Sequence, residues 1–219
     1  MCAPDTTLQV ARRNFIMTVP LRARWLLAMA SLMLALALAF PLWRISLVAP
    51  QYPEGLGMQI WAHTVAGIGP NDLQNINGLN HYIGMKAIVP DSIPELRIMP
   101  PGIVAMSVLG LLIAWKGTRR FLMLWVAALL LAGVVGLADF YRWEYDYGHN
   151  LDLENAPIQV PGMSYQPPLI GSKKLLNFTA TSWPATGGVL AILAVGVAIA
   201  AAVTTMRHPD APRRGTGAV

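Results

Sequence analysis

Four long apolar runs constrain the fold of this chain more than any other feature of its sequence. Each run holds about the 20 mostly apolar residues that a helix needs to cross a bilayer. Only 12% of the residues are charged, against about 25% in soluble domains. The sequence therefore predicts an all-α integral membrane protein with four transmembrane helices, which are Trp25–Trp43, Ile98–Trp115, Phe121–Tyr141 and Ala185–Thr205.

The basic residues predict how these helices are oriented. Ten of the sixteen lie before the first run, between the second and third runs, or after the fourth run: Arg12, Arg13, Arg22, Arg24, Lys116, Arg119, Arg120, Arg207, Arg213 and Arg214. Because Lys and Arg accumulate in the cytoplasmic segments of membrane proteins, both termini are predicted to be cytoplasmic. The formal net charge of +5 then reflects membrane orientation and not nucleic-acid binding.

The same orientation places the two long connections, residues 44–97 and 142–184, together on the extracytoplasmic face. Each connection is too short to form a core of its own. We therefore expect one small cap over a single membrane domain that covers residues 1–219. The ends, residues 1–20 and 207–219, are predicted to be flexible, because the last stretch is rich in Pro, Gly and charge.

A histidine and a methionine in the first connection offer soft metal ligands. Residues 71–85 are predicted to form a helix, on which His81 and Met85 stand four residues apart and share a face. Imidazole and thioether groups suit copper, and Cu(I) above all. The alternative is structural: a histidine bonded to the cap backbone and a methionine resting on the bilayer surface. Pattern alone favours this structural alternative.

Charged residues follow the third apolar run. If the helix continues beyond the membrane, Asp139, Arg142 and Asp146 lie on one face and predict a ladder of ion pairs. His149 lies near the same face. It is either a structural histidine, which the pattern favours, or a metal ligand or proton-handling group. Met163 is predicted to stand on a tight turn within a proline-rich segment.

Aromatic residues at and after the end of the third run support a different function. Trp and Tyr side chains are frequent at protein–protein hot spots. A docking surface for a periplasmic or redox partner, without any metal, is predicted at Tyr141, Trp143, Tyr145 and Tyr165. A third interpretation, quinol binding at the membrane rim, ranks last because the sequence offers no haem site to receive the electrons.

Several catalytic and cofactor motifs are absent from the sequence. It has no Walker, HExxH, GxSxG or CxxCH motif, and its single cysteine excludes an intrachain disulfide and a CxxC site. The apolar runs contain no histidine and, apart from Asp139, no charged residue. We therefore expect neither a haem between the helices nor an ion path across them, and we expect that the protein is not an enzyme.

Long segments of both connections resemble a family of small four-span membrane proteins encoded in gene clusters for nitrous oxide reductase and its accessory factors. The resemblance rests on the segments FPLW, APQYPEGLGM, NINGLNHYIGMK, DSIPELRIMP, DFYRWEYDYGHNLD and VPGMSYQPPLIGSKKLLNF, which cover about half of the chain. It implies copper handling on the periplasmic face of the bacterial inner membrane, during maturation of the reductase that acts in denitrification.

The resemblance also implies ligands and partners. The positions that match the family's motifs are His81, Met85, His149 and Met163, and together they would bind one Cu(I) through soft, exchangeable ligands from both connections. The expected recipients of the copper are a periplasmic chaperone or the apo-reductase, with membrane accessory subunits as further partners. The structural alternative for each of these side chains stays open.

Overall fold

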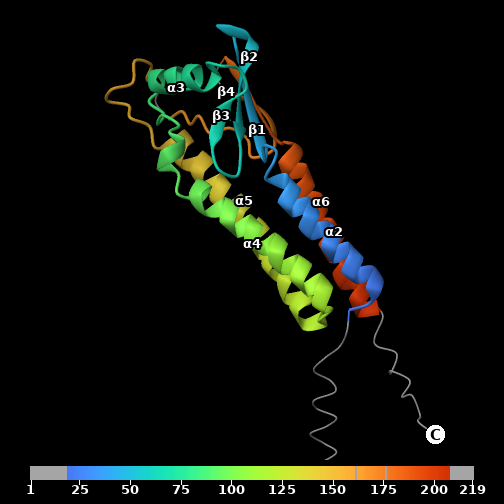
Figure 1. The fold of residues 1–219 in the computed structure, drawn as a ribbon. Coiled ribbons are helices and arrows are strands. Elements are labelled where there is room, and N and C mark those ends of the chain that lie inside the picture. The colour runs from blue at the N-terminus through green and yellow to red at the C-terminus, as the bar shows by residue number, and fades with distance from the viewer. Residues whose placement is uncertain (1–18, 161, 176, 208–219) are drawn as a thin grey trace, which may run out of the picture.

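The computed structural model describes residues 19–207, apart from residues 161 and 176. The predicted flexible ends fall almost entirely outside the described residues, together with the basic residues Arg12, Arg13, Arg213 and Arg214. Figure 1 shows a layer of long helices with a smaller unit, made of a sheet and a short helix, at one end. The two ends of the described chain leave the helical layer at the opposite end.

Among the described residues, four helices make up the long layer, and three of them are long and apolar enough to cross a membrane. These three are α4 (Glu95–Lys116), α5 (Arg119–His149) and α6 (Thr186–Arg207). The fourth, α2 (Leu21–Ala37), has 17 residues and ends well before the predicted limit at Trp43. The prediction of four transmembrane helices is therefore corrected to three candidate spans, with α2 packed beside them.

A proline explains why α2 ends early. Pro41 has no backbone N–H to donate, and its ring disfavours the helical conformation at Phe40. Leu38 caps the C-terminus of the helix, and its N–H donates a hydrogen bond to the Ala35 carbonyl at 3.2 Å. The apolar residues that follow Pro41 alternate instead of repeating with helical spacing, and they enter the sheet.

Small side chains let α2 and α6 pack closely along their lengths. Four alanines of α6 share one buried cluster with Ala23 and Ala30 of α2, and these are Ala194, Ala198, Ala201 and Ala202. Small residues allow the helix backbones to approach each other, which is a main source of helix association in lipid. α4 joins the same layer beside Trp125 of α5, whose indole N–H donates to the carbonyl of Met106 at 2.8 Å.

A five-stranded antiparallel sheet lies at the centre of the smaller unit, and it shows that the all-α prediction is wrong. Its order is β3-β2-β1-β5-β4, and its strands are β1 (Trp43–Ala49), β2 (Tyr52–Ile60), β3 (Val65–Gly67), β4 (Gly171–Leu175) and β5 (Phe178–Pro184). Three strands come from the first connection and two from the second. They join where β1 pairs with β5, with Ile45 opposite Ser182. The fold is therefore mixed.

The paired strands β1 and β5 connect to the helices α2 and α6, which lie side by side in Figure 1. β1 follows α2, and α6 follows β5 after a single residue, Ala185. The Ala185 N–H donates to the carbonyl of Leu42 at 3.0 Å, and the Gly187 N–H donates to the carbonyl of Pro41 at 2.8 Å. A Cβ atom on Gly188 would overlap the Leu42 carbonyl oxygen, so this junction closes only around glycine.

The helix α3 (Asp72–Tyr82) lies against β2 and β3. Its start is fastened by the Asp72 carboxylate, which accepts hydrogen bonds from the N–H groups of Gly57 and Gly69, both at 2.9 Å. The helix begins where the sequence predicts but ends at Tyr82, three residues before the predicted limit. A short 3-10 turn, Pro90–Ser92, then leads to α4.

The last turns of α5 leave the apolar run and enter the cap. With 31 residues, α5 is about 46 Å long, whereas the hydrocarbon core of a bilayer is about 30 Å thick. The helix is therefore longer than a single span needs, and residues 142–149 follow its apolar run. Near this end, the Phe140 ring packs edge-on against Trp43 of β1, with ring centroids 5.3 Å apart. The Gly148 carbonyl accepts a hydrogen bond from the N–H of Tyr165 at 2.9 Å.

A candidate metal-binding hollow on the cap

The end of α3 and the segment that follows α5 enclose a hollow of about 520 Å³ on the cap. Its walls are formed by His81, Gly84, Met85, Lys86, Asn150, Leu151, Asp152, Asn155 and Ala156. His81 and Lys86 are exposed and Met85 is half-buried, so the hollow is open to solvent. One imidazole and one thioether are among the groups that line it.

The turn at Gly84 leads Met85 to the hollow that His81 also lines, although the two residues do not share a helix face. Gly84 adopts a left-handed conformation with φ of 75°. The Met85 N–H donates to the Asn80 carbonyl at 2.8 Å and the Gly84 N–H donates to the His81 carbonyl at 3.3 Å. This pair of bonds is the Schellman termination of a helix, which reverses the chain after its last turn.

Gly84 also allows the two walls of the hollow to meet. Its carbonyl accepts a hydrogen bond from the Asp152 N–H at 2.8 Å. A Cβ atom at this position would lie 2.7 Å from the Asp152 carbonyl oxygen. A side chain here would therefore separate the wall that carries His81 from the wall that carries Asp152.

Gly84→Ala is expected to destabilise the cap by about 2 kcal/mol. The left-handed conformation costs an L-residue about 1–2 kcal/mol, and the displaced Asp152 backbone adds to that cost. Gly78→Ala is the matched control, since no atom lies within 4 Å of its added Cβ and helix propensity favours alanine by about 1 kcal/mol. Thermal unfolding in detergent compares the two variants. Equal melting temperatures would contradict this role of Gly84.

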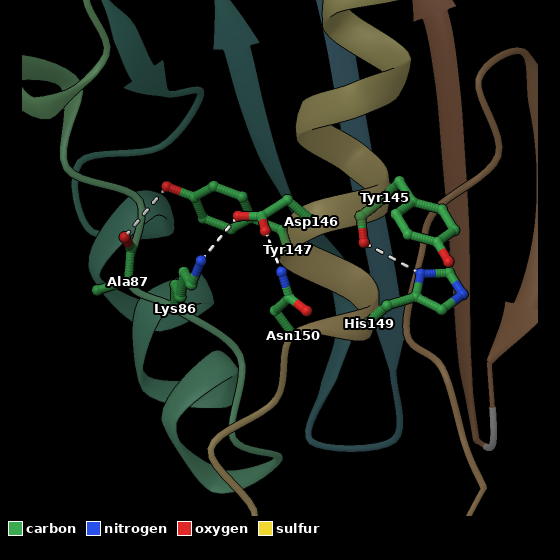
Figure 2. A network of polar contacts seen from close by, with 7 residues as sticks. All are labelled: Lys86, Ala87, Tyr145, Asp146, Tyr147, His149 and Asn150. Carbon is green, nitrogen blue, oxygen red and sulfur yellow. Dashed lines mark hydrogen bonds and ion pairs between the residues drawn. The ribbon is translucent and has the colours of Figure 1, made fainter.

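A polar network fixes the rim of the hollow (Figure 2). The Lys86 ammonium contacts the Asp146 carboxylate at 2.8 Å, and the Asn150 amide donates to the same carboxylate. The hydrogen bond from Lys86, followed by that from Asn150, lowers the pKa of Asp146. The Tyr147 hydroxyl donates to the Ala87 carbonyl at 3.4 Å. Exposed ion pairs contribute little to stability, so the network mainly positions α5 against the segment after α3.

A carboxylate lies beside the imidazole within the hollow. Asp152 accepts two hydrogen bonds from Asn155, one from the backbone N–H at 3.2 Å and one from the side-chain amide at 2.9 Å. These bonds, the side-chain one first, lower the pKa of Asp152, and the nearby charge of His81 adds a smaller contribution. The hollow therefore presents an ionised carboxylate that favours a bound cation.

The structure places the other two predicted ligands outside the hollow. The His149 ring stacks on Tyr145 with centroids 4.0 Å apart, and its Nδ1 lies 3.0 Å from the Tyr145 carbonyl oxygen (Figure 2). Met163 is half-buried on a turn closed by its own N–H and the Val160 carbonyl at 3.2 Å. Within the described residues, no group of three or more His, Cys, Asp or Glu side chains is arranged to hold a metal.

The charged residues of α5 form two separate contacts and not one ladder. Arg142 pairs with Asp139 at 2.8 Å and with Glu95 of α4 at 3.2 Å. Asp146 pairs with Lys86 from the other connection. Arg142 therefore joins α5 to the start of α4, while Asp146 joins α5 to the wall of the hollow.

The aromatic residues divide into exposed and buried groups. Tyr141 and Tyr145 are 49% and 50% exposed, and their rings lie 6.5 Å apart, one helical turn from each other. Tyr145 in turn stacks on His149, which extends this exposed row. Trp143 is half-buried and Tyr165 is only 4% exposed. The side chains available for docking are therefore those of the row Tyr141, Tyr145 and His149.

The structure reveals a further polar residue that the sequence reasoning did not treat as a site. Glu144 is only 5% exposed, and neither of its carboxylate oxygens has a hydrogen-bond partner among the described residues. Burial raises its pKa to about 7. Phe140, Glu144 and Gly148 are spaced four apart on the face of α5 that turns towards the cap. The four-residue spacing of Phe140, Glu144 and Gly148 in the sequence could have predicted that Glu144 is buried.

No protein-family model, curated protein or solved structure matches the chain. The interpretation of the hollow therefore rests on its geometry and on its side chains.

Proposed function

We propose that this protein is a membrane-anchored accessory protein that binds Cu(I) at His81 and Met85 on its cap and transfers the ion to a partner. One observation carries the proposal: the two side chains line the same hollow, because the Schellman turn at Gly84 reverses the chain between them. Nitrogen and thioether donors select Cu(I) over hard cations such as Mg²⁺ and Ca²⁺.

The composition of the hollow suits a cargo ion that must leave again. Two soft protein ligands leave a coordination position open, and a donor from the receiving protein can occupy it during transfer. The carboxylate of Asp152 adds negative charge nearby. Lys86, the cation on the rim, is held by Asp146. His149 and Met163 line no part of this hollow, so the proposed site contains two of the four expected ligands.

The distribution of charge supports a location for the cap. At the end of the helical layer opposite the cap, the described basic residues include Arg22, Arg24, Lys116 and Arg207. Basic residues mark the cytoplasmic side of a membrane protein. The proposed location is accordingly the bacterial inner membrane, with several helices in the bilayer and the cap in the periplasm.

The proposed recipient comes from the resemblance of the two connections to the proteins of nitrous oxide reductase gene clusters. In this proposal the protein is not an enzyme, and copper passes from the hollow to a periplasmic chaperone or to the apo-reductase. Membrane accessory subunits are further candidate partners. The loose, open coordination of two ligands fits a role in transfer better than a role in permanent storage.

A second function is favoured by the exposed row on α5. Tyr141, Tyr145 and His149 present a continuous strip of rings on the cap. Aromatic strips of this kind are typical of protein interfaces. In this alternative the protein is a non-catalytic subunit that docks a periplasmic or redox partner through the strip and binds no metal.

Metal content measured by mass spectrometry tests the copper proposal. The full chain is purified in detergent, loaded with Cu(I) and compared with His81→Ala/Met85→Ala. We expect about one copper per chain in the wild type and a loss of at least tenfold in affinity in the variant, since both soft ligands are removed. His149→Ala/Met163→Ala is the matched control, because it removes the same two residue types outside the hollow and is expected to retain the ion.

Two outcomes would contradict the copper proposal. One is a wild-type protein without copper, and the other is equal loss of copper in the two double variants. Co-purification of a reductase with copper-free wild-type protein would instead support the docking alternative.

A further inference from the structure

A second hollow lies at the opposite end of the molecule from the cap, between the start of α2 and the end of α6. It has a volume of about 610 Å³. Arg22 of α2 and Arg207 of α6 both line it, because the two helices are antiparallel and their ends meet there (Figure 1). Among the residues that the structure describes, no acidic side chain lines it.

Within residues 19–207 as described, the two arginines have no side-chain partner. Arg24, two residues from Arg22, donates to the carbonyls of Ala114 and Trp115 and so caps the end of α4. Neither Arg22 nor Arg207 forms an ion pair or a side-chain hydrogen bond with any described residue. Both are exposed. Two guanidinium groups that face one hollow without a carboxylate are suited to an anion, and to phosphate in particular.

Apart from Thr204, whose hydroxyl donates to the Ala200 carbonyl of its own helix, the remaining walls are mostly apolar and follow the charged end along the helices. Leu26 and Met29 stand on the same side of α2 as Arg22, at i+4 and i+7. Val203 of α6 faces them, one turn before Arg207. Met29 lies about 10 Å along the helix from Arg22, towards the cap. The hollow is therefore charged at the membrane surface and apolar below it, which is the polarity of a phospholipid.

An exposed tryptophan indicates where the hollow lies relative to the membrane surface. Trp25 lines it and is 70% exposed. Trp115, at the same end of the helical layer, is 73% exposed. Exposed tryptophans gather at the level of the lipid headgroups. Arg22 and Arg207 therefore lie at the level where a lipid phosphate is found.

We propose that the hollow between α2 and α6 binds one anionic glycerophospholipid from the adjoining leaflet. Arg22 and Arg207 hold its phosphate, and an acyl chain lies along Leu26, Met29 and Val203. Basic hollows between membrane helices are known to recognise anionic headgroups. This site is separate from the copper hollow and does not depend on it.

Native mass spectrometry of the full chain in detergent, titrated with phosphatidylglycerol and with phosphatidylethanolamine, tests this proposal. We expect the wild type to prefer phosphatidylglycerol. Arg22→Gln/Arg207→Gln is expected to reduce that preference by about tenfold or more. Each arginine near an anionic headgroup adds favourable electrostatic free energy to the binding of the lipid. The control Lys116→Gln/Arg44→Gln removes the same charge from exposed positions outside the hollow and is expected to keep the preference.

A third variant separates a lipid from a soluble anion. Met29→Trp fills the apolar floor without changing charge, so it is expected to weaken the binding of phosphatidylglycerol. The proposal is overturned if the wild type binds the two lipids equally, or if the double arginine variant behaves like its control. It is also overturned if inorganic phosphate at the lipid concentration displaces phosphatidylglycerol while Met29→Trp binds it normally, which would identify a site for soluble phosphate.

Discussion

Gly148→Val is expected to detach the proline-rich segment from α5 and to destabilise the cap by about 3 kcal/mol or more. A Cβ atom on Gly148 would overlap the backbone N and Cα atoms of Gln166, which cannot rotate away as a side chain can. The hydrogen bond from the Tyr165 N–H to the Gly148 carbonyl would be broken by the same displacement. Thermal unfolding in detergent, followed by circular dichroism, measures the effect.

Helix propensity alone predicts the opposite result for this substitution. Glycine is the worst ordinary residue in a helix interior, so replacing it favours the helix by a few tenths of a kcal/mol. Gly136→Val in the same helix isolates that contribution, because no atom lies within 4 Å of the added Cβ. A Gly148→Val protein as stable as the Gly136→Val protein would show that the contact with Gln166 does not hold the segment.

The stability of the cap is expected to fall as the pH rises from about 4.5 to about 7, because of Glu144. Burial raises the pKa of Glu144 from 4.5 to about 7, so the folded state binds this proton more tightly than the unfolded state. The stabilisation is complete below the unfolded value and is lost as the pH rises through the folded value. A shift of this size corresponds to a free energy on the order of 3 kcal/mol.

Glu144→Gln is expected to flatten this dependence and to be more stable than the wild type at pH 8. The amide has the same shape but no charge to bury. Glu154→Gln, at an exposed position, is the control and is expected to keep the wild-type profile. Unfolding measured between pH 4.5 and 8 checks the prediction. Asp146 and Asp152 do not affect this measurement. Their pKa values are lowered, so their contributions to the free energy of unfolding are lost only at pH values below this range. An unchanged slope in Glu144→Gln would refute the assignment.

Composition and hydropathy predict the long helices but not the sheet. The apolar runs at Ile98–Trp115 and Ala185–Thr205 correspond to α4 and α6 within a few residues. The pairing of β1 with β5 joins residues more than a hundred positions apart, which no local pattern reveals. The strands also contain residues that are depleted in sheets, such as Pro53, Gly55 and Lys173. The stretch FTATSWP of β5 was the clearest local indication of a strand, because it is rich in β-branched and aromatic residues.

The candidate site was predicted in part. The sequence placed His81 and Met85 on one helix, whereas the structure ends that helix at Tyr82 and brings the two together by a turn. Gly84 was the residue in the sequence that indicated this turn, since a glycine just after a helical pattern is typical of a helix C-terminus. The separation of His149 and Met163 from the hollow depends on how α5 packs, and that packing is set by Glu144 and Gly148 facing the cap.

The short connections that join β1 and β5 to α2 and α6 have a mechanical consequence. Residues 38–42 link α2 to β1, and backbone hydrogen bonds from Ala185 and Gly187 to the carbonyls of Leu42 and Pro41 tie this link to the start of α6. We therefore expect a force applied to the sheet to reach α2 and α6 through this hydrogen-bonded junction. α4 is joined to the cap through residues 83–94, which contain only one short 3-10 turn. A partner that pushes on the cap is therefore expected to tilt α2 and α6 more strongly than α4.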